Sequence, residues 1–294
     1  MKPTNIRKLV FLGLVIISLK GLSQNENQSI QSYQDHKPTT HHLVALEVIK
    51  ASKDWINAFN KGDVETCLAG YDQKALMKVT PMGIKNGIEE ISDFWISFVE
   101  SGANNLVYTD VSVEVINETT VFLSAHWSMN VGSGIIFQEK WEKKFDKWVL
   151  TYDDFQVLNQ FETPRFSSMN PTESHRVLEE VINTSINWIH GFNDGNAMVC
   201  GNGYSIDAVM NAYPFGVFQG KEVISGFWSN LIQEGAKNIT YHNPTFKTTT
   251  KQSAFISSLW SMNIGEGKIY QEKWENINSQ WVLTYDEFEV LKQY

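Results

Sequence analysis

Tryptophan and carboxylate side chains are the residues of this sequence with the clearest chemical potential. The chain of 294 residues contains 10 tryptophans, and Glu139 and Asp153 lie inside strand-like runs of apolar residues. Indole rings are large apolar groups that fill a core or line a pocket. Two carboxylates in one site can bind a cation or a polyol, or can exchange protons with a substrate. These residues are the first candidates for a functional site.

The same residues occur twice, because the chain matches itself without a gap when it is shifted by 133 residues. Between Trp55 and Leu158, 45 of 104 positions are identical in the second copy, and Gln138–Glu142 recurs as Gln271–Glu275. This period is far longer than the repeat of a solenoid protein. Each copy is therefore predicted to be a whole domain.

The pattern within one copy predicts helices first and strands afterwards. Apolar residues at helical spacing predict a helix over 43–59 that ends at Gly62, a short helix capped by Asp63, and a helix over 88–98 that ends at Gly102. Runs rich in Val, Ile, Phe, Tyr and Trp predict four strands over 106–116, 120–131, 135–145 and 148–158, after a short extended piece over 75–80. This order is typical of an α+β fold.

Charge and composition divide the chain into five segments. Residues 1–23 hold four basic and no acidic residues around an apolar run over 9–19, which predicts a cleaved signal peptide. The predicted boundaries are 1–23 for the signal peptide, 24–40 for a polar linker, 41–161 for copy one, 162–172 for a second linker and 173–294 for copy two. We therefore expect a periplasmic or extracellular protein.

The net charge limits the expected partners. Of 24 basic and 33 acidic residues, four basic ones lie in the predicted signal peptide, so the remainder carries a charge of −13. Such a surface disfavours nucleic acid and anionic membranes. We expect no nucleic-acid partner, no membrane contact after signal cleavage, a possible small-molecule ligand, and packing of the two copies on each other.

The order of elements resembles the nuclear transport factor two-like superfamily, with its SnoaL-like and ketosteroid-isomerase-like branches. The resemblance covers each copy nearly end to end and is carried by the segment 59–63, by Gly87 before Phe94-Trp95, and by the hairpin of Trp141 and Trp148. It implies two tandem cone-shaped domains, each a curved antiparallel sheet wrapped around about three helices. Because this superfamily hosts many activities, the fold does not imply a reaction.

Known chemistries of the superfamily are largely missing from this chain. The resemblance places Trp55 and Trp95 where ketosteroid isomerases have pocket tyrosines, and it places no carboxylate at the position of their base, which falls at Val79 or Thr80. The Tyr-Asp pair of scytalone dehydratase becomes Phe59-Asn60. Neither mechanism is expected here.

The resemblance instead implies an aromatic cup with two carboxylates in each copy. The implied pocket residues are Trp55, Trp95, Glu139, Thr151, Asp153 and Phe155 in copy one, and Trp188, Trp228, Glu272, Thr284, Asp286 and Phe288 in copy two. Residues 151, 153 and 155 then share one side of a strand. Burial and like charge are expected to raise the pKa of at least one acid, and the lining suits a cationic or polyhydroxylated ligand.

Each of these features also has a purely structural interpretation. The tryptophans can be core residues, and the acids can be paired with Lys140, Asn60 or a backbone amide. Cys67 and Cys200 are interpreted as buried thiols, not as a disulfide, and no cysteine and histidine spacing predicts a metal site. No cofactor and no catalytic residue is assigned.

Three functions remain open from the sequence. The first is an exported small-molecule-binding protein with one pocket per copy. The second is a non-catalytic interaction or assembly module whose pockets are filled by its own side chains. The third is a SnoaL-like lyase, isomerase or hydrolase that uses the carboxylate pair. An open cavity of about 300 Å³ or more supports the first, and a cup plugged by tryptophans supports the second.

Overall fold

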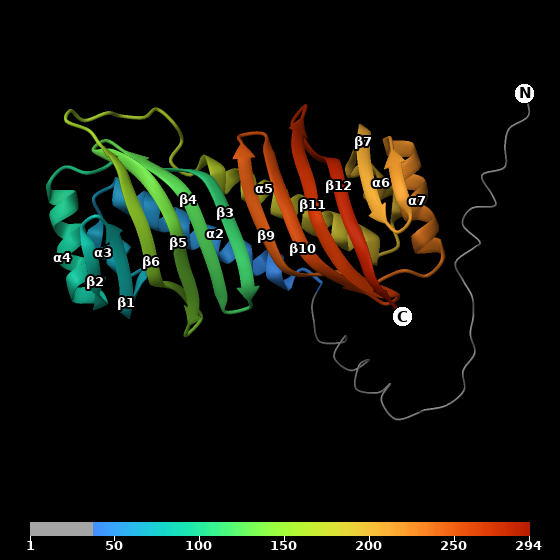
Figure 1. Cartoon of the computed structure of the whole chain (residues 1–294), viewed down its shortest axis with the longest axis horizontal. Helices are drawn as coiled ribbons and strands as arrows, with labels where there is room; N and C mark the ends of the chain where they lie inside the picture. The colour runs from blue at the N-terminus through green and yellow to red at the C-terminus, as the bar shows by residue number, and fades with distance from the viewer. Residues whose placement is uncertain (1–37) are drawn as a thin grey trace, which may run out of the picture. The chain divides into compact units, whose positions relative to one another are not determined.

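A computed structural model describes residues 38–294, in which six helices cover one face of a twelve-stranded sheet (Figure 1). The predicted signal peptide and most of the residues 24–40 lie outside the described residues. Within this part of the chain, no helix is long and apolar enough to cross a membrane. The prediction of an α+β fold is confirmed.

The first half contains three helices and six strands. Its elements are α2 (Thr40–Asn60), α3 (Val64–Leu68), β1 (Tyr71–Thr80), β2 (Gly83–Asn86), α4 (Gly87–Glu100), β3 (Val107–Asn117), β4 (Thr120–Met129), β5 (Gly132–Lys144) and β6 (Lys147–Gln160). Residues 161–172 hold neither helix nor strand. We call residues 40–160 the first half and residues 173–293 the second half.

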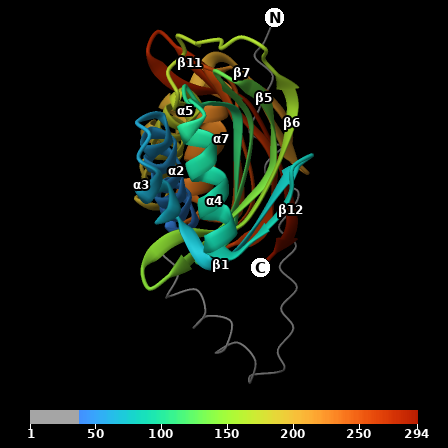
Figure 2. The same cartoon turned by 90° about the vertical axis from the view of Figure 1, so that its left-hand side faces the viewer.

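The second half repeats this order element by element. Its elements are α5 (Glu173–Asn193), α6 (Ala197–Asn202), β7 (Tyr204–Tyr213), β8 (Gly216–Gln219), α7 (Lys221–Gln233), β9 (Thr240–Thr250), β10 (Ser253–Met262), β11 (Gly265–Ile277) and β12 (Gln280–Gln293). Figure 2 shows the helices on one side of the curved strands. The concave side of the sheet and the helices therefore enclose the apolar core.

Local signals in the sequence explain the helix boundaries. The helix α2 buries Val48, Ile49 and Ile56 at helical spacing, and the chain turns after it at Gly62, whose φ is +72°. Glycine adopts such a φ without a steric penalty, because it has no Cβ. The carboxylate of Asp63 then accepts a hydrogen bond from the Thr66 backbone N–H at 3.0 Å and begins α3 as predicted.

The sheet differs from the expected pair of antiparallel cones in two ways. The strand β1 pairs in parallel with β6, and β7 pairs in parallel with β12, so the sheet is mixed. The strands β3 and β9 pair with each other, with Val113 opposite Phe246, so all twelve strands form one continuous sheet. The hydrogen bonds of this junction replace the free edges that two separate sheets would expose.

The helices α2 and α5 also meet behind the junction of β3 and β9. The ring of His42 is hydrogen-bonded through Nε2 to the Ser185 hydroxyl at 3.1 Å, and the Ser52 hydroxyl is bonded to Nε2 of His175 at 3.0 Å. These two contacts are equivalent, because His175 and Ser185 lie 133 residues after His42 and Ser52. All four side chains are buried.

Candidate functional site

Two carboxyl groups lie side by side on the concave face of the first half. Glu139 on β5 and Asp153 on β6 occupy directly opposite positions of an antiparallel pair, and they are 4% and 5% exposed. Opposite side chains in such a pair have Cβ atoms about 5 Å apart. The second half has the same arrangement, with Glu272 opposite Asp286.

Tyrosine and tryptophan donors surround these acids. The Tyr71 hydroxyl donates to Oδ2 of Asp153 at 2.7 Å and accepts from the indole N–H of Trp95 at 3.3 Å. The Tyr108 hydroxyl donates to Oε1 of Glu139 at 2.9 Å, and the indole N–H of Trp141 donates to Oε2 at 2.9 Å.

The second half repeats this network bond for bond. Its donors are Tyr204, Trp228, Tyr241 and Trp274, and its three bonds to Asp286 and Glu272 measure 2.6 to 3.0 Å.

Burial raises the pKa of both acids in each pair. For Glu139 the main cause is loss of solvation, and the nearby charge of Asp153 adds to it. For Asp153 burial again dominates, while the hydrogen bond from Tyr71 partly offsets the rise in pKa. The pKa of Glu272 and of Asp286 is raised by burial in the same way. The raised pKa favours the protonated form of the acids in each pair, as expected for two like charges in an apolar site.

A small cavity in the first half touches the acid pair. It has a volume of about 40 Å³. Its walls are mainly aromatic and aliphatic, and they include Trp55, Tyr71, Val79, Met82, Phe94, Trp95, Tyr108, Trp127, Ile136, Leu150, Phe155 and Val157. Met82 is 41% exposed, so this wall reaches the protein surface at the turn between β1 and β2. The cavity has room for water or a molecule of a few atoms, well below the roughly 300–1,000 Å³ of most ligand sites.

The structure brings together most of the residues that the sequence indicated. Trp55, Trp95, Glu139, Asp153 and Phe155 all line the cavity. In the second half, Trp228 lies 5.0 Å from Trp188 and 5.8 Å from Phe288 between ring centroids, and Phe288 is 7% exposed. The aromatic groups of both halves therefore form compact clusters.

Thr151, which was expected in the pocket, is not among the residues that line this cavity. A β-bulge places Leu150 opposite Trp141 and Tyr152 opposite Lys140, so the strict alternation of β6 is broken at Thr151. Leu150 lines the cavity in its place, and the Thr151 hydroxyl donates to the Lys140 carbonyl at 3.4 Å. Thr284 makes the equivalent bond to Lys273 at 3.5 Å. A bulge shifts every later side chain by one face, which a count of alternating residues cannot reveal.

The donors Tyr71, Tyr108 and Trp141 were not identified as site residues from the sequence. The available signal was their recurrence as Tyr204, Tyr241 and Trp274 within strands. Trp127 was also missed. It packs over Gly134, where an added Cβ would lie 2.7 Å from the indole ring and 1.8 Å from the Gln156 carbonyl oxygen. Gly134 therefore makes room for the wall of the cavity.

Each acid network also contacts a histidine from the other half. His175 lies 6.0 Å from Tyr108 between ring centroids, and His42 lies 5.6 Å from Tyr241. Tyr108 and Tyr241 are the donors to Glu139 and Glu272. Burial lowers the pKa of His42 and of His175 to about 3, so both rings are neutral.

Two equivalent asparagines each hold a loop in place. Asn60 donates through Nδ2 to the Leu106 carbonyl at 2.8 Å and accepts from the Leu106 N–H at 2.6 Å. Asn193 makes the same pair of bonds with Ile239. Among residues 38–294, no group of histidine, cysteine and carboxylate side chains is arranged to hold a metal ion.

The comparisons with known proteins concern the fold. No family model matches the chain, and no curated protein matches it. Among solved structures, an NTF-2 like protein of unknown function from Shewanella oneidensis is 19% identical, with 37% of this chain and 96% of that chain covered and a TM-score of 0.34.

Two further structures are similar to the same extent. A putative scytalone dehydratase from Novosphingobium aromaticivorans is 10% identical, with 40% of this chain and 85% of that chain covered and a TM-score of 0.36. A ketosteroid isomerase-like protein from Erwinia carotovora atroseptica is 12% identical, with 39% and 96% covered and a TM-score of 0.36. These likenesses assign neither a ligand nor a reaction to this chain.

Proposed function

We propose that this protein is exported and binds a small molecule at the carboxyl pair of Glu139 and Asp153. One observation carries the proposal: two carboxyl groups with raised pKa lie against a cavity with aromatic walls. Burial of two acids opposes folding, and perturbed acids in a cavity are typical of functional sites. Export is supported by the charge and length of residues 1–23.

The hydrogen bonding of the pair indicates the class of ligand. A pair that holds a proton can donate one hydrogen bond and accept another, as a hydroxyl group requires. The aromatic walls suit the apolar part of such a molecule, and they attract a cation as well. Free carboxylate and phosphate groups are disfavoured, because they would lie against the remaining negative charge. We therefore propose a small alcohol or polyol, with amines as the second class.

The size of the cavity sets the limit on the ligand. About 40 Å³ admits a molecule of a few atoms with the walls as they stand. A larger ligand requires Met82 and Phe94 to move away from the mouth. Methionine is flexible and half-exposed here, so it is the side chain whose movement costs least.

A second function is favoured by the cavity volume, because about 40 Å³ lies below the 300 Å³ that was set as the criterion for an open ligand site. If the walls stay closed, the cavity is simply the interior of a non-catalytic interaction or assembly module. The carboxyl oxygens of Glu139 and Asp153 already accept hydrogen bonds from Tyr71, Tyr108 and Trp141, which a structural role of these acids requires.

A binding experiment with a cavity-filling variant separates the two functions. We expect cyclohexanol or benzylamine to raise the Tm of the full chain in a concentration-dependent way. Val157→Phe fills the cavity and should abolish this rise, whereas Leu158→Phe, on the next and 52% exposed residue, should retain it. An unchanged Tm in the wild-type chain at every concentration of both compounds would favour the closed interior.

A further inference from the structure

The interface between the two halves has approximate two-fold symmetry in its contacts. One hydrogen bond joins His42 to Ser185, and a second joins Ser52 to His175. Each residue of the first bond lies 133 positions from the residue of the same type in the second bond, so the two bonds are equivalent. In a symmetric interface each contact has an equivalent partner contact. Any pair that lacks such an equivalent therefore shows where the two halves have become different from each other.

Sequence divergence is concentrated in the strands that join the halves. Residues 111–120 read VSVEVINETT and residues 244–253 read PTFKTTTKQS, with no identical position among ten. In the rest of the segment from Trp55 to Leu158 the halves are closely similar, since 45 of the remaining 94 positions are identical. These ten residues include the whole paired region of β3 and β9.

Side-chain volume differs across the centre of this interface. Val113 and Phe246 are equivalent positions, they lie directly opposite each other, and both are 0% exposed. Two first halves would place valine against valine and leave a void. Two second halves would place phenylalanine against phenylalanine in the same space. Voids and overpacking both destabilise a close-packed core.

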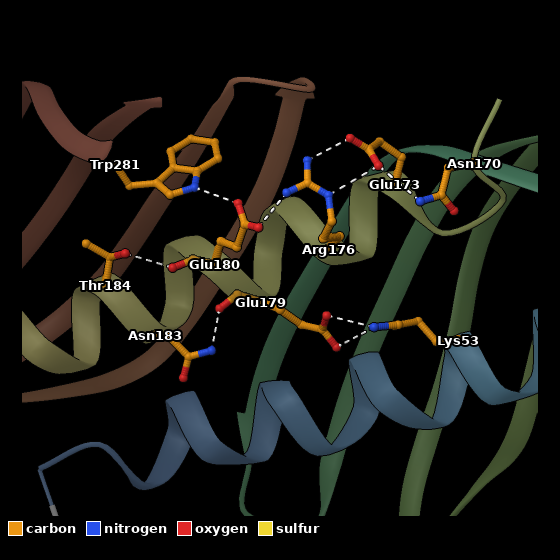
Figure 3. Close-up of polar contacts among 9 residues, drawn as sticks. All are labelled: Lys53, Asn170, Glu173, Arg176, Glu179, Glu180, Asn183, Thr184 and Trp281. Atoms are coloured by element: carbon orange, nitrogen blue, oxygen red, sulfur yellow. Dashed lines mark hydrogen bonds and ion pairs between the residues drawn. The ribbon is translucent and has the colours of Figure 1, made fainter. Parts of the chain in front are cut away.

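An ion pair between α2 and α5 has no equivalent at the positions 133 residues away. Lys53 on α2 contacts Glu179 on α5 at 2.7 Å, and both side chains are about three-quarters buried (Figure 3). Their equivalents are Ile186 and Leu46, which are apolar and partly buried. Pairing of two identical halves would place Lys53 near Leu46, or Glu179 near Ile186, and so leave a partly buried charge without its partner.

Charged residues on the outer face of the junction of β3 and β9 also differ between the two halves. Glu114 lies opposite Thr245 and Lys247 lies opposite Ser112, so Glu114 and Lys247 occupy diagonal positions on one face. Glu114 and Lys247 are also equivalent positions of the two halves. Two first halves would bring two glutamates together there, and two second halves would bring two lysines together.

From these three differences we infer that the interface selects its partner: the first half is built to pair with a second half and to reject another first half. The surface formed by β3 and the adjoining face of α2 therefore fits one kind of partner, which is the corresponding surface of a second half. This inference is independent of the proposed ligand. It implies that identical halves of neighbouring chains do not join.

Exchange of the central side chains in the full chain tests the inference. Val113→Phe recreates the contact of two second halves, and Phe246→Val recreates that of two first halves. We expect each single variant to lower the Tm by at least about 4 °C, and the double variant to return to within about 2 °C of the wild type. A double variant whose Tm falls by the sum of the two single losses would overturn the inference.

Two controls keep this test decisive. Ile91→Val is a buried change on α4, which packs on β1, β2 and α3 away from the junction, and its loss should add to that of Val113→Phe without recovery. If Val113→Phe does not fold, exchange of the charges of Lys53 and Glu179 tests the inference instead. Lys53→Glu and Glu179→Lys should each lower the Tm by about 1–3 °C, and the double variant should recover it. If the Tm of the charge-exchanged double variant falls by the sum of the two single losses, the inference is contradicted.

Discussion

The hydroxyl of Tyr71 donates a 2.7 Å hydrogen bond to Asp153, and the same bond joins Tyr204 to Asp286 at 2.6 Å. All four side chains are buried. Tyr71→Phe removes the donor to Asp153 and also the acceptor of the Trp95 indole N–H. Loss of these buried bonds should cost about 1–3 kcal/mol and lower the Tm by several degrees.

Thermal unfolding of matched variants checks this prediction. Tyr204→Phe should produce a similar loss, because its environment is equivalent. Tyr152→Phe removes a hydroxyl that bonds Asp154 on the outer face, and it should leave the Tm nearly unchanged. Equal losses for Tyr71→Phe and Tyr152→Phe would show that burial of the network is not what matters.

Replacement of one acid by its amide tests whether the pair holds a proton. Asp153→Asn keeps the shape of the side chain and supplies a permanent N–H donor in place of the carboxylic acid O–H. We expect the Tm at neutral pH to change by no more than a few degrees, with alcohol binding weakened at this site. A sharp loss of Tm, with alcohol binding unchanged, would identify Asp153 as a structural acid outside the ligand site.

The raised pKa of the four acids predicts a loss of stability as the pH rises. The folded state binds more protons than the unfolded state, so the free energy of unfolding should fall as the pH rises from about 5 to about 8. Denaturant unfolding at several pH values measures this slope. The double variant Glu139→Gln/Glu272→Gln should flatten it, and an unchanged slope would contradict the assignment of protons to these pairs.

The interface histidines predict the opposite trend at acid pH. Burial lowers the pKa of His42 and of His175 to about 3, so the unfolded state binds more protons below the usual histidine pKa of about 6.5. These two histidines by themselves lower the stability as the pH drops below about 6.5, and their effect should dominate below about pH 4, where the four acids are protonated in both states. The double variant His42→Gln/His175→Gln should reduce the loss of stability at acid pH. It should not change the dependence of stability on pH above pH 7.

The two cysteines should be unreactive in the folded protein. Cys67 and Cys200 are free and buried, and burial raises the pKa of each thiol to about 12. A thiol in this state presents almost no thiolate to a reagent. A colorimetric thiol reagent should detect no thiol in the native protein and two after denaturation, and rapid native labelling would show that the helices α3 and α6 open readily.

The sequence predicted the order of elements because each signal was local. The apolar spacing of α2, the turn at Gly62 and the cap at Asp63 act within a few residues, and the structure places them as expected. The buried thiols of Cys67 and Cys200 are confirmed for the same reason.

Features that depend on distant residues were not predictable. The pairing of β3 with β9 joins residues more than 130 positions apart, and nothing in β3 alone indicates its partner. The bulge at Thr151 depends on how β6 aligns with β5. The donors Tyr71 and Tyr108 reach the acids from other strands, and residue type alone does not show which buried tyrosine meets which carboxylate.

The most direct test of ligand binding follows the indole N–H signals of Trp95 and Trp141, which report on the two ends of the acid network. Two-dimensional NMR of the full chain during titration with cyclohexanol measures both signals. The proposed function predicts that both shift in a saturable way in the wild type and in Leu158→Phe, but not in Val157→Phe. Indole signals that stay in place in the wild-type chain up to the solubility limit of cyclohexanol would contradict it.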